Sequence, residues 1–147
     1  MPSIDKTREY AASPQELWAA VADLRAWPEW LTVLKEWRSE PPQDLAVGVQ
    51  LDATISVMSI PMAVTWTVNE CREPETLTMA GPAVLNSQVT LRTAVAPTAA
   101  GSQVELHIDV ENPMLMGPLG ETLIRAITSD VEQSMANLEA RLAAAAG

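Results

Sequence analysis

Apolar and polar residues alternate along most of the chain between residues 49 and 112. In one clear run, Leu51 and Ile55 share one face while Asp52 and Thr54 share the other. Alternation with a period of two is typical of a β-strand that buries one face. The same pattern recurs in residues 62–70, 76–81, 86–97 and 103–112. These runs predict an antiparallel sheet that is covered on one side only.

A helical period appears before this region, in residues 14–24, after a weakly alternating first strand in residues 3–10. Ser13 is a favourable N-cap, Pro14 suits the first helical position, and Glu16 completes a capping box with Ser13. Apolar residues recur about one turn apart, and these residues are Leu17, Val21 and Leu24. We therefore predict an amphipathic helix that begins at Pro14.

The first helix is expected to end between Asp23 and Trp27, because the residue before a proline avoids the α-helical region. Pro28 can then open a second short helix over residues 28–34. Residues 35–50 read as a strand followed by a turn. Two short helices thus meet at a bend between the first and second strands.

The last third of the chain changes back to a helical period and predicts one long helix over residues 118–142. Its apolar stripe comprises Leu119, Leu123, Ile127, Val131, Met135, Leu138 and Leu142. The helix is long enough to lie across the apolar face of the predicted sheet. No internal repeat or linker interrupts the pattern, so residues 1–147 are expected to form one α+β domain.

The charge of the chain narrows the range of partners. Nine Lys and Arg residues stand against nineteen Asp and Glu residues, which gives a formal net charge of −10. Nucleic-acid binding depends on basic residues that neutralise phosphates, and anionic membranes attract basic surfaces, so both partners are disfavoured. A basic protein partner is compatible with the charge.

No run of residues approaches the ~18 apolar residues of a membrane span, so membrane insertion is not expected. The first ten residues are polar and charged and do not resemble a secretory signal. A cytoplasmic location is therefore expected.

Residues with catalytic potential are few. His107 is the only histidine and falls on the polar face of its strand with Glu105 and Asp109, so we expect it on the solvent side. Cys71 is the only cysteine and lies in a predicted strand, where a half-buried structural role is expected. No group of residues has metal-ligand or phosphate-loop spacing. The sequence therefore assigns no catalytic residue, metal or cofactor.

Four of the five tryptophans fall between Trp18 and Trp37, in a chain without phenylalanine. Trp18, Trp27 and Trp30 are interpreted as structural residues of the helical bend. Base stacking is the alternative, but acidic and basic residues are balanced in residues 23–38 and no basic groove is indicated. The facing of Trp37 stays open.

The segment "ASPQELWAAVADLRAWPEW", the alternating strands and the closing long helix together resemble the START and birch-pollen-allergen superfamily, called SRPBCC. The resemblance covers nearly the whole chain and is nearest to the bacterial polyketide cyclase/dehydrase-like branch. Within that branch, "WLTVLKEWRSEPP" and "GPLGETLIRAITSDVEQSMANL" are similar to actinobacterial proteins named as toxins of type II toxin–antitoxin pairs.

This resemblance implies a helix-grip fold, in which a curved seven-stranded antiparallel sheet wraps around the C-terminal helix and encloses a cavity. It also implies an apolar or amphipathic ligand, such as a lipid or a polyketide, and it carries no universal catalytic motif. Methionine side chains suit adaptable apolar surfaces, although they also serve as core filler. The predicted ligand-binding residues are Trp37, Met62, Trp66, Met79, Met114, Met116, Leu123 and Ile127.

Three functions follow as hypotheses. The first is binding of an apolar small molecule between the sheet and the last helix. The second is a toxin-like protein that acts through a protein partner. The third is a cyclase or dehydrase, which would require a polar group inside the cavity. The candidates for that group are Asn86, Ser87, Thr93 and Arg125.

Overall fold

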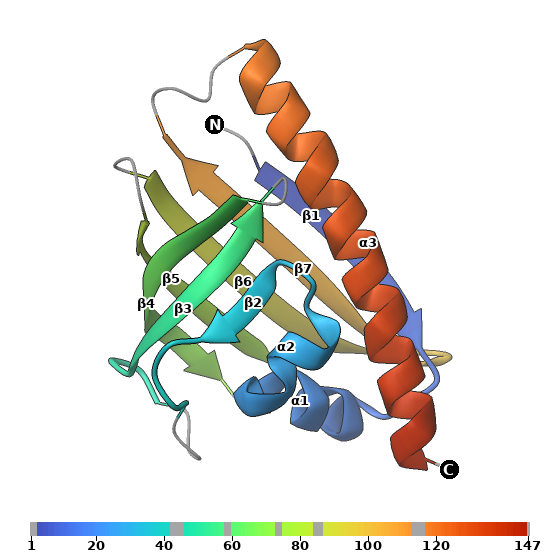
Figure 1. The fold of residues 1–147 in the computed structure, drawn as a ribbon. Helices are drawn as coiled ribbons and strands as arrows, with labels where there is room; N and C mark the ends of the chain where they lie inside the picture. Colours follow the sequence, from blue (N-terminus) through green and yellow to red (C-terminus); the bar gives the residue numbers. More distant parts are fainter. Residues whose placement is uncertain are drawn as a thin grey trace.

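Seven antiparallel strands form one curved sheet, and a long helix lies against its concave side (Figure 1). The computed structural model describes residues 3–41, 46–57, 60–72, 75–83, 87–112 and 117–146. The strands are β1 (Ser3–Tyr10), β2 (Leu34–Trp37), β3 (Gln50–Val57), β4 (Ile60–Arg72), β5 (Thr76–Ala83), β6 (Ser87–Thr98) and β7 (Gly101–Glu111). Their order across the sheet is β1-β7-β6-β5-β4-β3-β2.

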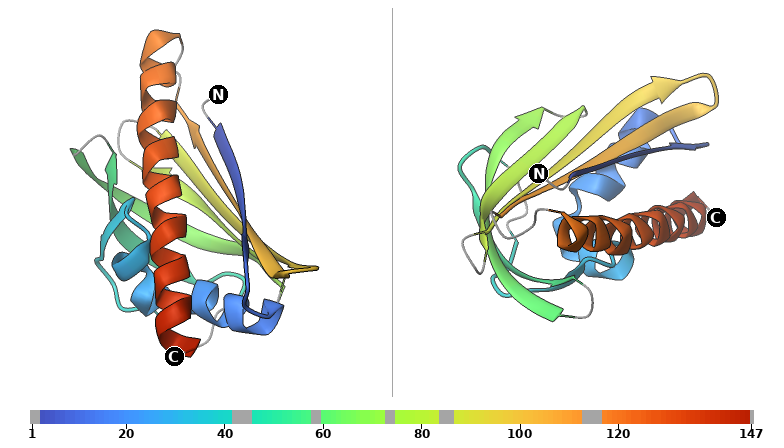
Figure 2. Two further views of the ribbon diagram at one scale, coloured as in Figure 1. Left: turned by 90° about the vertical axis from the view of Figure 1, so that its right-hand side faces the viewer. Right: turned by 90° about the horizontal axis from the view of Figure 1, so that it is seen from above.

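The helices are α1 (Pro14–Ala22), a 3-10 turn (Leu24–Ala26), α2 (Trp27–Trp30) and α3 (Pro118–Ala146). In the view from above, the sheet curves around α3, while α1 and α2 close one end (Figure 2). The two edge strands, β1 and β2, lie on opposite sides of α3. The α+β helix-grip architecture expected from the sequence is confirmed.

Local sequence explains where α1 begins. The Ser13 side chain accepts a hydrogen bond from the backbone N–H of Glu16 at 3.1 Å, and Pro14 occupies the first turn. The Glu16 carboxylate accepts a further bond from the Ser13 hydroxyl at 3.1 Å. Together these contacts form the predicted N-terminal cap, with the carboxylate bonded to the hydroxyl of Ser13.

The second helix is shorter than the sequence predicted, because α2 ends at Trp30 and does not continue to Leu34. Thr32 and Val33 are β-branched and favour extended backbone. The Thr32 N–H donates to the Ser134 hydroxyl of α3 at 2.9 Å, so it has a tertiary partner in place of a helical one. The chain therefore leaves α2 early and enters β2.

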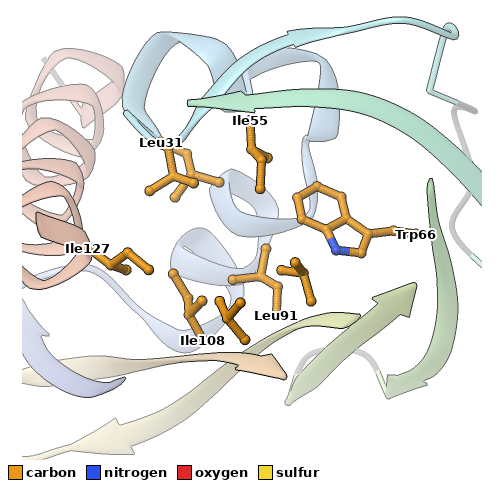
Figure 3. A pocket seen from close by; sticks show the side chains of 9 residues that line it. Leu31, Ile55, Trp66, Leu91, Ile108 and Ile127 are labelled. Atoms are coloured by element: carbon orange, nitrogen blue, oxygen red, sulfur yellow. The ribbon is translucent and has the colours of Figure 1, made fainter. Parts of the chain in front are cut away.

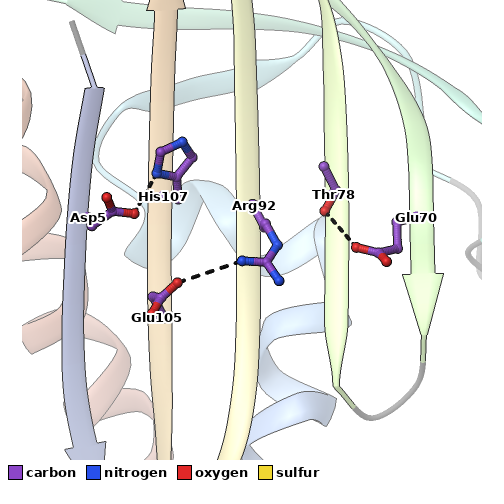
Figure 4. A network of polar contacts seen from close by, with 6 residues as sticks. All are labelled: Asp5, Glu70, Thr78, Arg92, Glu105 and His107. Carbon is purple, nitrogen blue, oxygen red and sulfur yellow. Dashed lines mark hydrogen bonds and ion pairs between the residues drawn. The ribbon is translucent and has the colours of Figure 1, made fainter.

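The alternation along the strands separates two faces of the sheet. The concave face and the inner stripe of α3 form one core cluster. On the opposite face, polar side chains of neighbouring strands pair with one another (Figure 4). Asp5 Oδ1 and His107 Nδ1 lie 2.5 Å apart, and Arg92 pairs with Glu105 at 3.7 Å. His107 thus lies on the polar face that the sequence predicted.

The apolar stripe of α3 is buried from Leu123 to Leu138. Leu119 was expected to belong to this stripe, but 48% of its surface is exposed. The first turn of α3, to which Leu119 belongs, extends past the strands (Figure 2). None of the described helices combines the length and the apolar character that crossing a bilayer requires.

Gly81 allows β5 to lie close against β4. A Cβ atom at this position would overlap the carbonyl oxygen of Thr65 and lie 3.0 Å from the Cα of Trp66. Only a residue without a side chain permits this approach. Gly81 therefore determines where the backbone of Trp66 lies in the sheet.

Candidate functional site

A pocket opens between the concave face of the sheet and α3 (Figure 3). Its volume, measured as the space open to the centre of a water-sized sphere, is about 20 Å³. The lining residues are Leu31, Val33, Ile55, Trp66, Val89, Leu91, Ile108, Val110 and Ile127. All nine have apolar side chains apart from the single N–H of the Trp66 indole. This pocket can hold a small apolar group, and its lining contains no acid or base for proton transfer.

Each side of the pocket comes from a different part of the chain. Strands β3, β4, β6 and β7 supply one to two residues each, and the α2–β2 connection supplies Leu31 and Val33. Helix α3 contributes Ile127, which faces the strand residues across the pocket in Figure 3. The pocket thus forms where the sheet, α3 and the helical bend come together. The helical bend is the segment from α1 to the α2–β2 connection, residues 14–33.

Four tryptophans form a continuous row of rings that runs from the helical bend to the pocket. The centroids of Trp30 and Trp27 are 6.0 Å apart, those of Trp27 and Trp37 are 5.9 Å apart, and those of Trp37 and Trp66 are 6.2 Å apart. Two of the contacts are edge-to-face, an arrangement that aromatic quadrupoles favour. Trp66, at one end of the row, forms part of the pocket wall.

The indole N–H groups of this row differ in their partners. Trp27 Nε1 donates to the carbonyl of Val21 at 2.7 Å, and Trp37 Nε1 donates to the carbonyl of Leu24 at 2.6 Å. Trp30 Nε1 and Trp66 Nε1 are buried and have no hydrogen-bond partner in the described part of the chain. The row therefore has bonded donors in its middle and unbonded donors at its two ends.

The C-terminal part of helix α3 makes polar contacts with other elements. A polar cluster joins this part to the end of the helical bend. Besides the Thr32–Ser134 bond, the Thr32 hydroxyl donates to the Asp130 carbonyl at 3.1 Å, and Asn137 Nδ2 donates to the Trp30 carbonyl at 3.2 Å. Ser134 is fully buried in this cluster. We call residues 130–141 the fastened half of α3.

Further contacts of the fastened half reach β1. The Tyr10 hydroxyl donates to the Met135 carbonyl at 3.0 Å, and burial raises the pKa of Tyr10 to about 12. Lys6 pairs with Glu132 at 3.1 Å, and Arg8 pairs with Glu139. These ion pairs are largely exposed, so each adds little stability.

The preceding residues of α3, 118–129, are called the pocket half because they carry Ile127. Within the described ranges, no side chain of the pocket half forms a hydrogen bond or an ion pair with the sheet or the short helices. The hydroxyls of Thr122 and Thr128 donate to carbonyls within the helix itself, those of Pro118 and Ile124. The pocket half is therefore held to the sheet by apolar contacts.

The structure brings two of the predicted ligand-binding residues to the pocket, namely Trp66 and Ile127. Trp37 is half-buried and contacts the Trp66 ring without lining the pocket. Met79 and Leu123 are buried in the core cluster, and Met62 packs against that cluster. Met114 and Met116 lie outside the described residues.

Sequence reasoning did not single out the other seven lining residues. Five of them, Ile55, Val89, Leu91, Ile108 and Val110, lie on the strands. The alternation places these side chains on the apolar face. It does not indicate which of the apolar residues of each strand border a pocket. Leu31 and Val33 were assigned to a helix that is absent at their positions.

Three of the four polar groups proposed for a catalytic cavity lie outside the pocket lining. Arg125 is exposed, and Thr93 is buried but does not line the pocket. The Ser87 hydroxyl accepts a hydrogen bond from Asn112 Nδ2 at 2.8 Å. Asn86 lies outside the described residues. None of the three described groups lines this pocket.

Comparison with protein families identifies the chain. The family model described as "Polyketide cyclase / dehydrase and lipid transport" matches residues 1–143. The chain belongs to this family. Membership agrees with the SRPBCC resemblance in the sequence and with an apolar pocket between sheet and helix.

Relatives of this family member include mycobacterial proteins. Toxin Rv0910 of Mycobacterium tuberculosis strain H37Rv is 34% identical over 124 residues, which are 84% of this chain and 86% of that protein. The uncharacterised protein Rv1546 of the same strain is 33% identical over 135 residues, which are 92% of this chain and 94% of that protein.

Solved structures share the fold at low sequence identity. TTHA0849 from Thermus thermophilus superposes with a TM-score of 0.81 at 17% identity, covering 99% of this chain and 100% of that chain. A START superfamily protein from Mycobacterium smegmatis gives a TM-score of 0.71 at 20% identity, covering 95% and 96% of the two chains. These similarities establish the helix-grip fold.

Proposed function

We propose that this protein binds an apolar small molecule between the concave face of the sheet and the pocket half of α3. The observation that carries the proposal is the pocket lining, in which nine side chains from six segments converge and expose only apolar atoms to the pocket. A cavity lined by apolar side chains favours apolar ligands, because their transfer from water into an apolar environment lowers the free energy. The family description, which includes lipid transport, supports the same class of ligand.

The volume of the pocket sets a condition on this function. Dry cavities of about 150 Å³ with similar linings bind benzene, whereas this pocket measures about 20 Å³. A ligand must therefore enlarge the pocket as it enters. The pocket half of α3 is the wall most suited to move, because only apolar contacts join it to the sheet and such contacts are not directional.

Naphthalene is a suitable first probe, since it is neutral, apolar and unable to form conventional hydrogen bonds. Isoleucine methyl resonances report its position, because Ile55, Ile108 and Ile127 line the pocket, whereas Ile4, the cross-strand partner of Ile108 on β1, does not. We expect saturable shifts of the three pocket methyls, with a smaller shift at Ile4, which is one strand removed from the lining. Absence of saturable shifts at the pocket methyls would overturn the proposal.

A matched pair of variants on β6 locates the binding site. Val89 lines the pocket and Val95 does not, yet both are buried on the same strand with 5% of their surface exposed. Val89→Leu adds a methylene to the pocket and is expected to weaken naphthalene binding about 5-fold or more, whereas Val95→Leu leaves the affinity near that of the unchanged protein. Equal effects of the two substitutions would contradict this location.

The relatives named as toxins favour a second candidate function, in which the protein acts through a protein partner. The supporting observation is the 34% identity to toxin Rv0910. Induced expression of the gene, alone and together with its neighbouring gene, tests this function. Growth inhibition that the neighbour relieves, with a complex of the two proteins, is the expected result. Normal growth together with no complex would refute it.

A further inference from the structure

The unbonded N–H of Trp66 is the one polar atom among the pocket-lining side chains, and it lies covered next to the pocket and not on the pocket surface. Only 2% of the Trp66 surface is exposed, and Nε1 has no hydrogen-bond partner in the described residues. In Figure 3 the nitrogen lies on the edge of the indole that is turned toward Leu91. Buried polar groups are nearly always hydrogen-bonded, so this exception requires a physical explanation.

A trapped water is a poor partner for this N–H. The pocket has room for about one water, which needs ~10–15 Å³ on the same measure. A buried water, however, requires roughly two to four polar partners, and the surface of this pocket exposes none. An acceptor atom carried on an apolar molecule satisfies the donor without leaving other polar atoms unbonded.

The absence of charged side chains from the pocket lining indicates that the acceptor is neutral. No lining side chain is cationic, so a carboxylate or phosphate would lose its hydration without gaining a counter-charge. A ketone, ester or ether oxygen has no such penalty. A ketone or ester also has no O–H that would itself need an acceptor.

We propose that the ligand is a neutral apolar molecule with a carbonyl-type oxygen that accepts the hydrogen bond of Trp66 Nε1. This inference rests on the proposed binding function and narrows it to one ligand chemistry. The apolar side chains that cover the nitrogen must separate for the oxygen to reach it. The movement that enlarges the pocket therefore has two effects. It makes room for the apolar part of the ligand, and it uncovers the N–H of Trp66.

Acetophenone and α-methylstyrene form a matched pair of probes, since the second replaces the carbonyl oxygen with a CH₂ group of similar shape. We expect acetophenone to bind roughly 3- to 10-fold more tightly than α-methylstyrene, as one neutral hydrogen bond allows. Its lower hydrophobicity would otherwise make it the weaker ligand. Calorimetric titration or methyl shifts give both affinities.

Trp66→Phe removes the donor, and Trp30→Phe is its matched control. Trp30 Nε1 is also buried and unbonded among the described residues, but Trp30 does not line the pocket. The ratio of the two probe affinities is the readout, because a change in pocket shape affects both probes similarly. We expect the ketone preference to disappear in Trp66→Phe and to persist in Trp30→Phe.

The indole proton of Trp66 gives a measurement that needs no stable variant at this position. Isotope-labelled protein shows one indole N–H resonance for each tryptophan, and the resonance of Trp66 can be assigned from its contacts with the methyls of neighbouring residues. Acetophenone is expected to move this resonance downfield, as a new hydrogen bond does, while α-methylstyrene does not. The resonance of Trp30 should stay in place with both probes.

The possible outcomes separate this inference from the proposed function. If neither acetophenone, α-methylstyrene nor naphthalene binds, apolar ligand binding itself fails. If all three bind but the ketone shows no preference and the Trp66 proton does not shift, the pocket binds apolar molecules without using this donor, and the inference is wrong. A ketone preference that survives Trp66→Phe also overturns it.

Discussion

The two halves of α3 differ in what holds them to the protein. The fastened half, residues 130–141, is joined to the helical bend through Ser134 and Asn137 and to β1 through the carbonyl of Met135. The pocket half, residues 118–129, has only apolar contacts with the sheet among the described residues. Both halves belong to one unbroken helix. The difference therefore lies in the side chains and not in the backbone.

This contrast assigns different tasks to the two halves. Hydrogen bonds require a fixed geometry, so the fastened half keeps α3 at one position relative to the helical bend. Apolar contacts tolerate small displacements, so the pocket half can move away from the sheet at lower cost. Regions that bind ligands are commonly drawn from the less stable parts of a structure. The protein thus combines a rigid attachment and an adaptable wall in a single helix.

The largest expected effect comes from truncating one core residue in each half. Ile127→Ala in the pocket half and Leu138→Ala in the fastened half should each lower the free energy of unfolding by about 2–5 kcal/mol. Both side chains are buried in the core cluster, and only Ile127 lines the pocket. Ile127→Ala should therefore strengthen benzene binding, whereas Leu138→Ala should not. Denaturant unfolding and benzene titration measure the two quantities, and benzene binding that rises equally in both variants would remove the distinction.

Hydrogen exchange compares the two halves in the unchanged protein. Amides of residues 131–138 are expected to exchange roughly 10- to 100-fold more slowly than those of residues 123–128, because the fastened half opens only when its tertiary hydrogen bonds break. Both windows lie inside α3, away from its fraying ends. Residue-resolved exchange measured by NMR decides the point. Equal protection in the two windows would show that the polar contacts do not set local stability.

Ser134→Ala tests the polar cluster itself. The substitution leaves the N–H of Thr32 without its partner and is expected to lower the free energy of unfolding by about 1–2 kcal/mol. Thr128→Ala is the matched control in the pocket half, since the Thr128 hydroxyl bonds only the Ile124 carbonyl one turn earlier. The control should change stability by less than about 0.5 kcal/mol. Similar losses in the two variants, measured by urea unfolding, would be evidence against a special role for the cluster.

A smaller, pH-dependent effect is expected at Tyr10, the only tyrosine. Burial raises its pKa from 10.0 to about 12, so folding favours the neutral hydroxyl. The resulting stabilisation is present below pH 10 and is lost as pH rises from about 10 through 12. Tyr10→Phe should lower stability by about 1 kcal/mol at neutral pH and lack this alkaline loss.

Two measurements check the Tyr10 prediction. Tyrosinate absorbance follows the titration of this single group directly, and unfolding curves of both proteins across the alkaline range follow its effect on stability. A titration in the folded protein near pH 10, the ordinary value, would contradict the predicted shift.

The fold could be predicted from the sequence because its signals are local and repeated. Alternation identified the strands, Ser13 and Pro14 marked the first helix, and an apolar stripe marked the last helix. The end of α2 was missed because the partner of the Thr32 N–H is Ser134, 102 residues away. No local pattern reports such a contact.

The pocket was harder to predict than the fold for a related reason. The sequence indicates which side chains face the core, but their level along the strands depends on register and curvature. Val89 and Val95 look alike in the sequence and are equally buried, yet one lines the pocket and the other does not. Trp66 was predicted because it shares the apolar face of its strand with Met62, and Met114 and Met116 were predicted because they precede the long helix.

Gly81 makes the pocket sensitive to a position that does not line it. Any side chain there collides with the backbone of β4 at Thr65, so a substitution requires β4 and β5 to move apart next to Trp66. A single codon change outside the lining could thereby alter which molecules fit. Under the proposed function, position 81 would therefore influence ligand choice from outside the pocket, at the expense of the stability of the β4–β5 pairing.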